Sequence, residues 1–328
     1  MEQTLESNSD THVITETQAV VISAPNEVGL KTVKLKVPGP DDVVIETKYT
    51  SISAGTERML IAGQMPHPML SLPVVPGYEN VGTIVSAGQK VADEWLGKQV
   101  YIGGSMCYED VNGAWGGQSA ILSANVDRVV PLNGLDPQPG LLLALAATAL
   151  HGIDRLGETN GKRILILGQG PVGQIAARIA RSRGATVIVT DRIDARLDRS
   201  EADQIINVDS ESLTDAITEP VSIIIDATGL MDAISASLPL LATGGTILLL
   251  GLYKNLELPY IPLFLKEANL LTVKEWAQGD LERCRDMMIS GSLDVSPLLT
   301  HHISVNKIED AYNTALTDPE CLKVVIEW

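Results

Sequence analysis

Hydrophobic and polar residues follow two different patterns along this chain. Between residues 17 and 131, short apolar runs of β type are separated by turns rich in proline and glycine. From residue 163 onward, apolar runs of strand length alternate with segments whose apolar residues recur at helical spacing. Such alternation is typical of a parallel, doubly wound sheet. We therefore expect an α/β protein in which a β-rich domain precedes a doubly wound domain.

The same patterns predict individual elements. In the first region we expect strands at 18–23, 43–49, 79–86 and 99–102, followed by a buried helix at 141–151. In the second we expect strands at 163–167, 185–190, 204–208, 222–226, 246–250, 270–275 and 321–326, and helices at 171–183, 280–290 and 308–316. The last strand is apolar except for Lys323, its one charged residue.

The stretch RILILGQGPVGQIAARIARSRGATVIVTD (163–191) carries the clearest chemistry in the chain. Gly168 permits a tight turn, Gly170 lets the backbone approach a pyrophosphate, and Gly173 lets the helix pack closely on the strand. The phosphates are then expected at the positive N-terminus of the helix. Asp191 ends the second strand, where its carboxylate can bind a ribose 2′-hydroxyl and repels the 2′-phosphate of NADP. The pattern predicts a dinucleotide site and favours NAD, with a plain structural turn as the alternative.

Two further strand ends are expected at the same site, because ligands of doubly wound sheets bind beside the carboxyl ends of the strands. These ends are 226–229 and 251–252, for which ordinary strand-to-helix turns are the alternative. The expected cofactor-binding residues are Gly168, Gln169, Gly170, Pro171, Val172, Gly173, Asp191, Arg192, Ala227, Thr228, Gly229, Gly251 and Leu252.

Composition and charge argue against several classes of partner and indicate where the protein is located. The net charge of −17 over 328 residues argues against nucleic acid and anionic membrane surfaces, since both are bound by basic patches. Three cysteines, Cys107, Cys284 and Cys321, form no CxxC motif and indicate reduced thiols in a cytoplasmic protein. The most apolar run, 141–150, has about half of the roughly 20 residues of a membrane helix, so no integral membrane segment is expected. Residues 1–16 are polar and are expected to be a disordered tail rather than a signal peptide.

The chain also carries GTE at 55–57, VPGYENVG at 75–82, the glycine fingerprint and the strand near 270–275. Together these features resemble the medium-chain dehydrogenase/reductase superfamily, over nearly the whole chain from residue 17. The resemblance implies a GroES-like catalytic domain at 17–144 and 277–328, a Rossmann NAD-binding domain at 145–276, and a homodimer joined through the 270–275 strand, since an edge strand seeks a partner.

Five stretches of the sequence resemble one particular group within this superfamily. They are SISAGTERML (51–60), VPGYENVG (75–82), LLALAATALHG (142–152), KEWAQGDL (274–281) and DPECLKVVIEW (318–328). Within the superfamily they are similar to the bacteriochlorophyllide a dehydrogenases of bacteriochlorophyll synthesis. This resemblance implies NAD-dependent oxidation of the 3-(1-hydroxyethyl) group of a tetrapyrrole, a chlorin or bacteriochlorin, to 3-acetyl.

Zinc-dependent members of the superfamily hold a catalytic zinc with a cysteine, a histidine and a further cysteine or acid. This chain has Ala54 before the GTE motif, Tyr78 in place of the histidine and Ala144 in place of the last cysteine. Because a catalytic zinc needs three good ligands, we expect no metal and a zinc-free dehydrogenase. The alternative is an unusual metal site formed by Glu57, Glu79 and His151.

Without zinc, a side chain must take the hydroxyl proton and stabilise the developing alkoxide. Thr56, at the family position whose hydroxyl touches the substrate, and Tyr78, with its phenol, are ranked first. Glu79 and His151 follow, because burial can raise the pKa of a carboxyl and histidine titrates near neutrality. Structural alternatives exist for all four: a helix cap for Thr56, a packed aromatic for Tyr78, an ion pair with an arginine such as Arg58 for Glu79, and a core histidine for His151.

A macrocyclic substrate needs a wide apolar cleft, and this chain has a single phenylalanine. The candidate wall residues are therefore Met59, Met65, Met69, Trp115 and Trp276. Arg58 or Lys274 is expected to pair with a propionate of the substrate.

Two other functions fit the sequence. A zinc-free quinone or enoyl reductase of the same superfamily would use NADPH; Asp191 argues against it, whereas the neighbouring Arg192 favours it. A nucleotide-binding protein without catalysis fits the missing zinc ligands.

Overall fold

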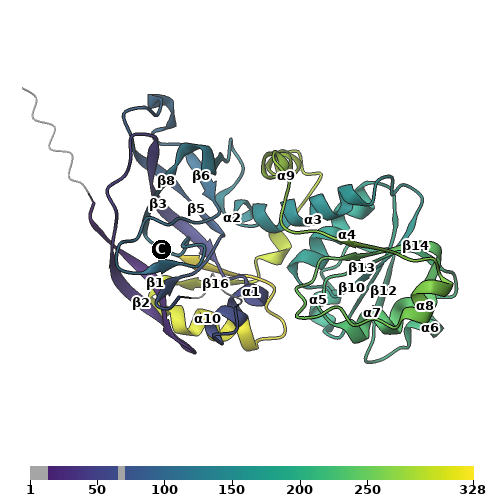
Figure 1. The fold of residues 1–328 in the computed structure, drawn as a ribbon. Coiled ribbons are helices and arrows are strands. Elements are labelled where there is room, and N and C mark those ends of the chain that lie inside the picture. The colour runs from purple at the N-terminus through teal and green to yellow at the C-terminus, as the bar shows by residue number, and fades with distance from the viewer. Residues whose placement is uncertain (1–13, 66–70) are drawn as a thin grey trace, which may run out of the picture.

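The computed structural model describes residues 14–65 and 71–328, so most of the expected tail lies outside the described residues. The strands of the described chain form three sheets. Figure 1 shows them as a β-rich part on the left and a second part on the right, whose sheet is flanked by helices. Helices α3 (Leu143–Arg155) and α9 (Asp280–Ile289) lie between the two parts.

The sheet of the second part is entirely parallel within the described chain. Its strands are β10 (Arg163–Leu167), β11 (Thr186–Asp191), β12 (Gln204–Asn207), β13 (Val221–Asp226), β14 (Leu241–Leu249) and β15 (Asn269–Thr272). They lie in the order β12-β11-β10-β13-β14-β15. The order reverses between β10 and β13, and such a switch point opens a crevice at the carboxyl ends of the strands. The predicted doubly wound sheet is confirmed, with its crevice at the glycine fingerprint.

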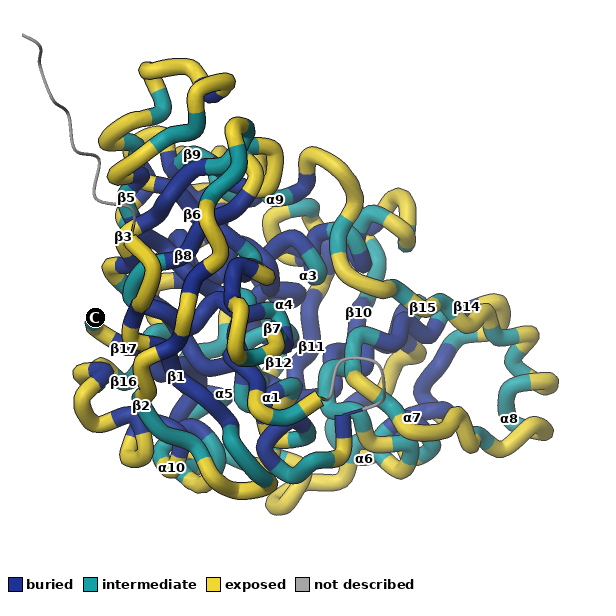
Figure 2. Tube along the Cα trace, turned by 60° about the vertical axis from the view of Figure 1, so that its left-hand side comes forward, coloured by how far each residue is buried: buried dark blue, intermediate teal, exposed yellow. Residues whose placement is uncertain are grey.

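Both faces of this sheet are buried, because side chains alternate between them along each strand. Ile164 and Ile166 pack into a core shared with α3 and α4, whereas Leu165 and Leu167 pack into a second core. The remaining helices of this part are α4 (Pro171–Ser182), α5 (Asp194–Leu197), α6 (Leu213–Ala216), α7 (Met231–Ser237) and α8 (Tyr260–Leu265). Figure 2 shows the buried strands in dark blue and α8 largely exposed at one end of the molecule.

Helix α4 follows the local signals of its sequence. Gly170 is its N-cap, Pro171 is its first residue, and Gly184 adopts a left-handed conformation (φ +81°) just beyond its end. The predicted helices at 171–183, 280–290 and 308–316 are therefore confirmed. Helices α5 to α8 were not predicted, because each has fewer than two turns and shows no helical periodicity.

The β-rich part contains the other two sheets. One joins β2 (Glu27–Lys34), β1 (Glu16–Ala24), β4 (Val74–Val75) and β7 (Asn112–Gly113). The other joins β16 (His301–Ser304), β17 (Val324–Glu327), β3 (Asp42–Ser51), β5 (Asn80–Ala87), β6 (Gln99–Ile102) and β9 (Val129–Pro131), with β8 (Ile121–Asn125) paired to β3. The helices are α1 (Ala54–Ile61), α2 (Pro137–Gly140) and α10 (Ile308–Thr317).

The C-terminal segment returns to the β-rich part. β17 pairs antiparallel with β3, and Figure 1 shows the yellow C-terminal elements beside the purple N-terminal ones. This return carries Tyr312 of α10 and Lys323, just before β17, toward the end of β3. The domain boundaries expected near 144 and 277 stay a prediction.

Several expected ends were wrong by a few residues: β14 begins at Leu241 and not at 246, and α3 ends at Arg155 and not at 151. β1 already begins at Glu16, which pairs with Lys34, so the expected tail was too long. The 270–275 strand ends at Thr272, opposite the last residue of β14, and Glu275 (φ +117°) has left the sheet. The last strand begins at Val324, after Lys323. Along the described ranges, no helix has the length and apolar character needed to cross a membrane.

Candidate cofactor and active site

The turn after β10 has the geometry that its three glycines predict. Gly168 is left-handed (φ +88°), and its N–H donates to the carbonyl of Thr190 at 2.8 Å. A side chain on Gly173 would collide with the carbonyl oxygen of Gly168, so close packing of α4 on the turn requires glycine there. A side chain on Gly170 would meet no described atom within 4 Å. Gly170 therefore leaves open space at the N-terminus of α4, where a phosphate can approach the backbone.

Asp191, the last residue of β11, lies beside this turn. One carboxylate oxygen accepts the N–H of Gln169 at 2.7 Å, and the other accepts the N–H groups of Arg192 and Ile193 at 2.7 and 3.0 Å. The carboxylate thus ties the glycine turn to the end of β11 and keeps a negative charge there. The side chain of Arg192 donates from Nε to both carboxylate oxygens of Asp209, at 2.9 and 3.1 Å.

The loops after β13 and β14 meet at the buried Asp226. Its carboxylate accepts the Thr228 hydroxyl at 2.5 Å, the Gly229 N–H at 3.0 Å and the phenol of Tyr253, while its carbonyl accepts the Gly251 N–H at 3.0 Å. Burial, and then the hydrogen bond to Asp226, raise the pKa of Tyr253 well above its usual value. The two loops expected at the cofactor site are therefore held together by one carboxylate.

The glycine turn, the end of β11 and the loop after β13 border a cavity of about 580 Å³. The predicted cofactor residues that line it are Gly168, Gly170, Asp191, Arg192, Ala227 and Thr228. The predicted residues outside its lining are Gln169, Pro171, Val172, Gly173, Gly229, Gly251 and Leu252. The Gln169 side chain is buried and accepts a hydrogen bond from Ser200 at 2.9 Å, so only its backbone can face a ligand.

On the β-rich part, three hydroxyl groups meet at the start of α1. The phenol of Tyr78 hydrogen-bonds with the hydroxyl of Ser53, the N-cap residue of α1, and lies 3.3 Å from that of Thr56. We call these three residues the hydroxyl cluster. Burial, and then the negative charge of Glu79, raise the pKa of Tyr78 above its usual value. Tyr78 is therefore a neutral phenol at physiological pH, and sequence reasoning correctly brought it together with Thr56.

Glu79 is engaged in a buried ion pair. Both its carboxylate oxygens lie 2.6 Å from Nζ of Lys323, and one also accepts the hydroxyl of Ser51. Its partner is thus Lys323 and not the expected Arg58, which donates to the carbonyl of Leu316 at 2.8 Å. With both oxygens occupied in the interior, Glu79 supports the neighbouring Tyr78 instead of facing a substrate.

Glu57 lies completely buried on the other side of α1. Its carboxyl accepts the Tyr312 phenol at 2.5 Å, the Ser53 N–H at 2.9 Å and the Gln118 amide at 3.2 Å. Burial, partly offset by these donors, raises the pKa of Glu57 to about 7. Through the Ser53 N–H, Glu57 fixes the start of the helix that carries the hydroxyl cluster.

His151 is not part of that cluster. Its Nδ1 lies 3.7 Å from the carboxylate of Asp280 on α9, and the described residues show no hydrogen bond from it to Tyr78 or Thr56. Asp280 in turn accepts from Arg283 at 2.9 Å. The alternative metal site is also not assembled: within the described ranges, no three His, Cys, Asp or Glu residues are grouped to hold a metal ion.

The expected substrate residues are distributed between both parts. Trp115 lies edge-to-face on Tyr78, with ring centroids 5.4 Å apart, and Met59 packs against the same core as Trp115. Trp115 has a left-handed backbone (φ +69°), unusual for an aromatic residue and typical of functional sites. Lys274 is almost fully exposed, near Glu275 at 3.8 Å.

The remaining candidates for the wall of a substrate cleft lie in different surroundings. Trp276 packs at the edge of the α3 core. Met65 is buried in the core, and its assignment to a cleft wall stays a prediction. Met69 lies outside the described residues.

Several residues of this site were not predicted. Ser53 lies two residues before the GTE motif, and its hydroxyl was a usable signal. Lys323 stood out as the one charge in an apolar strand, but nothing in the sequence pointed to Glu79 as its partner. Tyr312 and Gln118 carry no local signal, because their contact with Glu57 depends on the C-terminal return.

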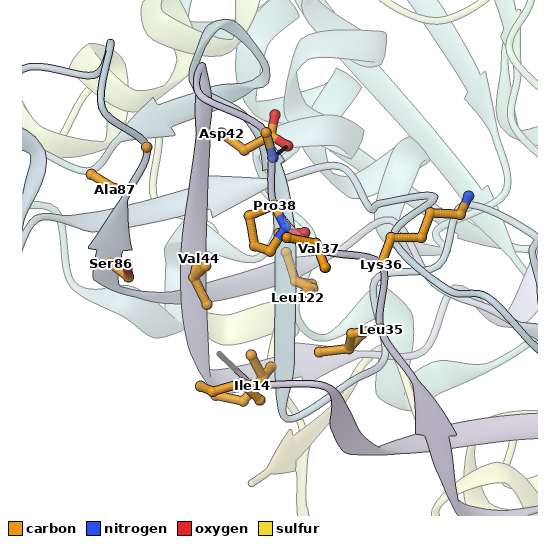
Figure 3. A pocket seen from close by; sticks show the side chains of 14 residues that line it. Ile14, Leu35, Lys36, Val37, Pro38, Asp42, Val44, Ser86, Ala87 and Leu122 are labelled. Atoms are coloured by element: carbon orange, nitrogen blue, oxygen red, sulfur yellow. Dashed lines mark hydrogen bonds between the residues drawn. The ribbon is translucent and has the colours of Figure 1, made fainter. Parts of the chain in front are cut away.

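A separate cavity of about 210 Å³ lies on the β-rich part, between residues 14–44 and the strands β5 and β8 (Figure 3). Ile14, Leu35, Val44 and Leu122 give it an apolar lining. It contains none of the predicted site residues.

Comparisons with known proteins agree with this architecture. Residues 39–134 match the model of the alcohol dehydrogenase GroES-like domain, and residues 171–289 match that of the zinc-binding dehydrogenases. A 2-desacetyl-2-hydroxyethyl bacteriochlorophyllide A dehydrogenase from Cereibacter sphaeroides is 33% identical over 320 residues, covering 95% of this chain and 98% of that protein. The chain belongs to the medium-chain dehydrogenase/reductase superfamily. The protein of the same name from Rhodobacter capsulatus is also 33% identical, over 317 residues, with the same two coverages.

Solved structures share the fold of this dehydrogenase. A zinc-binding dehydrogenase from Sinorhizobium meliloti bound to NADP has a TM-score of 0.84 and 22% identity, covering 96% of this chain and 100% of that one. An alcohol dehydrogenase from E. coli CFT073 complexed with NADH has a TM-score of 0.84 and 20% identity, with the same coverages. The predicted GroES-like and Rossmann architecture is confirmed. The chain is an oxidoreductase that acts on a CH–OH group.

Proposed function

We propose that this dehydrogenase oxidises the 3-(1-hydroxyethyl) group of a bacteriochlorophyllide or related chlorin to 3-acetyl with NAD, and without zinc. The substrate class is supported by the two relatives of that name, which match over nearly their whole length. The chemistry is carried by one observation: Tyr78, at the sequence position of a zinc-binding histidine in zinc-dependent members of the superfamily, joins Ser53 and Thr56 in the hydroxyl cluster.

The side chains around Tyr78 do not fit a zinc ion. Ala54 and Ala144 have no donor atoms, and Tyr78 is a neutral phenol. The nearby carboxyl groups of Glu57 and Glu79 are each saturated by protein donors. A tetrahedral site with three protein ligands is therefore missing at this position, and stabilisation of the developing alkoxide falls to hydroxyl groups.

The hydroxyl cluster can perform this task. When bound, the nicotinamide supplies the acceptor for the hydride that leaves the hydroxyl-bearing carbon. We assign the donor role in the Ser53–Tyr78 hydrogen bond to the Ser53 hydroxyl. The phenol hydrogen of Tyr78 is then free to hold the substrate oxygen as negative charge develops. Thr56 is partly exposed and lies 3.3 Å from the same phenol, so its hydroxyl passes the substrate proton toward water. A phenol with a raised pKa serves as donor, not as base.

The cofactor preference rests on Asp191. Its carboxylate lies at the end of β11 in the lining of the 580 Å³ cavity, where the ribose of a dinucleotide is expected. A carboxylate at this place accepts a 2′-hydroxyl and repels a 2′-phosphate. This supports NAD over NADP.

The assembly we propose is a homodimer. β15 is the edge strand of its sheet, and α8 beside it exposes Tyr260, Ile261, Phe264 and Leu265, each at least 60% accessible. A second copy would cover this apolar face and pair the strand edge. Phe264→Asp is then expected to give monomers in light scattering, whereas a wild-type monomer would refute the dimer.

The test of the proposed function is an anaerobic assay of metal-stripped protein with NAD and 3-(1-hydroxyethyl) chlorins, following NADH and the pigment spectrum together. We expect NADH and the acetyl pigment to form in equal amounts. Turnover of quinones with NADPH, and none of the chlorin, would favour the quinone reductase alternative. Binding of NADH without hydride transfer to any of these substrates would favour a non-catalytic protein.

A further inference from the structure

Arg192, a lining residue of the cofactor cavity, forms an exposed ion pair with Asp209. Arg192 follows Asp191 directly and lines the cavity with it. An arginine at this place is the residue that accommodates the 2′-phosphate in NADP-dependent enzymes. Here, its Nε is bound by both carboxylate oxygens of Asp209, at 2.9 and 3.1 Å. The one cation next to Asp191 in sequence is therefore already neutralised by an acid from a different loop.

Backbone hydrogen bonds of the loop after β12 also fix the position of Asp209, in addition to the ion pair of its side chain. Its N–H donates to the side-chain oxygen of Asn207 at 3.0 Å, and the Asn207 amide donates to Asp194 at 2.5 Å. The N–H of Val208 donates to the carbonyl of Asp191 at 3.1 Å. The loop after β12 is thus tied to the loop after β11, which holds Asp209 opposite Arg192.

The other cation of the cavity is also engaged. Arg196 donates from Nε to the carbonyl of Pro319 at 2.8 Å. Glu211 adds a further acid to the lining. A 2′-phosphate entering this cavity would therefore meet the Asp191 carboxylate and an arginine whose charge is balanced.

We propose that Asp209 is a specificity-determining residue, which withholds the guanidinium of Arg192 from a 2′-phosphate and so excludes NADP. The inference rests on the proposed NAD preference of this site. Asp191 supplies the repulsion, and Asp209 removes the compensating attraction. Loss of Asp209 releases Arg192 to form charge-assisted hydrogen bonds with the phosphate.

The test compares the dissociation constants of NADH and NADPH, measured by nicotinamide fluorescence on binding. The proteins are wild type, Asp209→Ala, Arg192→Ala and the double variant. Asp209→Ala is expected to bind NADPH about tenfold more tightly, with NADH binding within about twofold of wild type. The gain should vanish in the double variant and shrink at high salt, since the pair is exposed.

Glu211→Ala is the matched control, because it removes one negative charge from the cavity lining that includes Arg192, and this charge forms no hydrogen bond with Arg192 in the described structure. We expect its gain in NADPH affinity to be below about twofold and to survive the addition of Arg192→Ala. An equal gain in Glu211→Ala and Asp209→Ala would overturn the inference, as would unchanged NADPH binding in Asp209→Ala. In both cases tight NADH binding leaves the proposed function standing. A wild type that prefers NADPH, or that binds neither dinucleotide, would overturn both.

Discussion

The buried pair Lys323–Glu79 allows a quantitative test of how the C-terminal return supports the site. Both side chains are about 1% exposed or less, and Nζ lies 2.6 Å from both carboxylate oxygens. Lys323→Met removes the ammonium while keeping an unbranched apolar chain, which leaves the Glu79 carboxylate buried without a counter-charge. Breaking a buried ion pair in this way costs about 3–5 kcal/mol of the free energy of unfolding.

The assay is urea unfolding followed by tryptophan fluorescence and far-UV circular dichroism. Lys90→Met serves as the control, because the Lys90–Asp41 pair at 3.1 Å is 62% and 49% exposed and should contribute only about 0–1 kcal/mol. Adding Glu79→Gln to Lys323→Met neutralises the stranded charge and should recover most of the loss. The reasoning is refuted if Lys323→Met is no less stable than Lys90→Met, or if the double variant is no more stable than Lys323→Met alone.

Further predictions concern the hydroxyl cluster, Glu57 and the glycine turn. Tyr78→Phe should lower kcat by about 10²- to 10³-fold with unchanged NADH affinity, because the Tyr78 phenol holds the alkoxide. Ser53→Ala should lower kcat by less, because Ser53 only orients the phenol. Steady-state kinetics test both variants, and a normal kcat in Tyr78→Phe contradicts the assignment. Burial raises the pKa of Glu57 from 4.5 to about 7, so its contribution to stability is complete below pH 4.5 and is lost as the pH rises to about 7. Glu57→Gln should flatten this part of the stability profile in urea titrations, and an unchanged slope would argue against it. Gly173→Ala should lower the melting temperature, because the alanine side chain would strike the Gly168 carbonyl. Gly170→Ala should keep the melting temperature and weaken NADH binding, and calorimetry measures both the melting temperature and the affinity. Equal behaviour of the two variants would contradict the roles assigned to them.

The elements of the parallel-sheet part around the glycine turn could be predicted from the sequence, because the sequence features that determine them are local. The glycine turn, the helix start at Pro171 and the strand end at Asp191 all lie within one continuous stretch. Helix α8 could not be predicted, since it is short and its apolar residues point outward, without the one-sided periodicity of a packed helix.

The side-chain contacts around the candidate active site were harder to predict, because they join segments that are distant in the sequence. For Glu79 the structural alternative was an ion pair with an arginine such as Arg58, but its partner is Lys323, which the C-terminal return brings in from far along the chain. His151 was considered as a proton acceptor and as a metal ligand, and its partner Asp280 on α9 is identified only by the three-dimensional structure. Candidate residues could be named from the sequence, whereas their pairings across the chain required the fold.

The most direct measurement of the central claim is the turnover number as a function of bound metal. Purified protein is stripped with a chelator, its zinc content is measured by mass spectrometry, and oxidation of the hydroxyethyl chlorin with NAD is assayed before and after one equivalent of zinc is returned. If the hydroxyl cluster stabilises the alkoxide, kcat is the same in both samples and falls only in Tyr78→Phe. Activity that disappears with the zinc and returns in proportion to it would contradict the account.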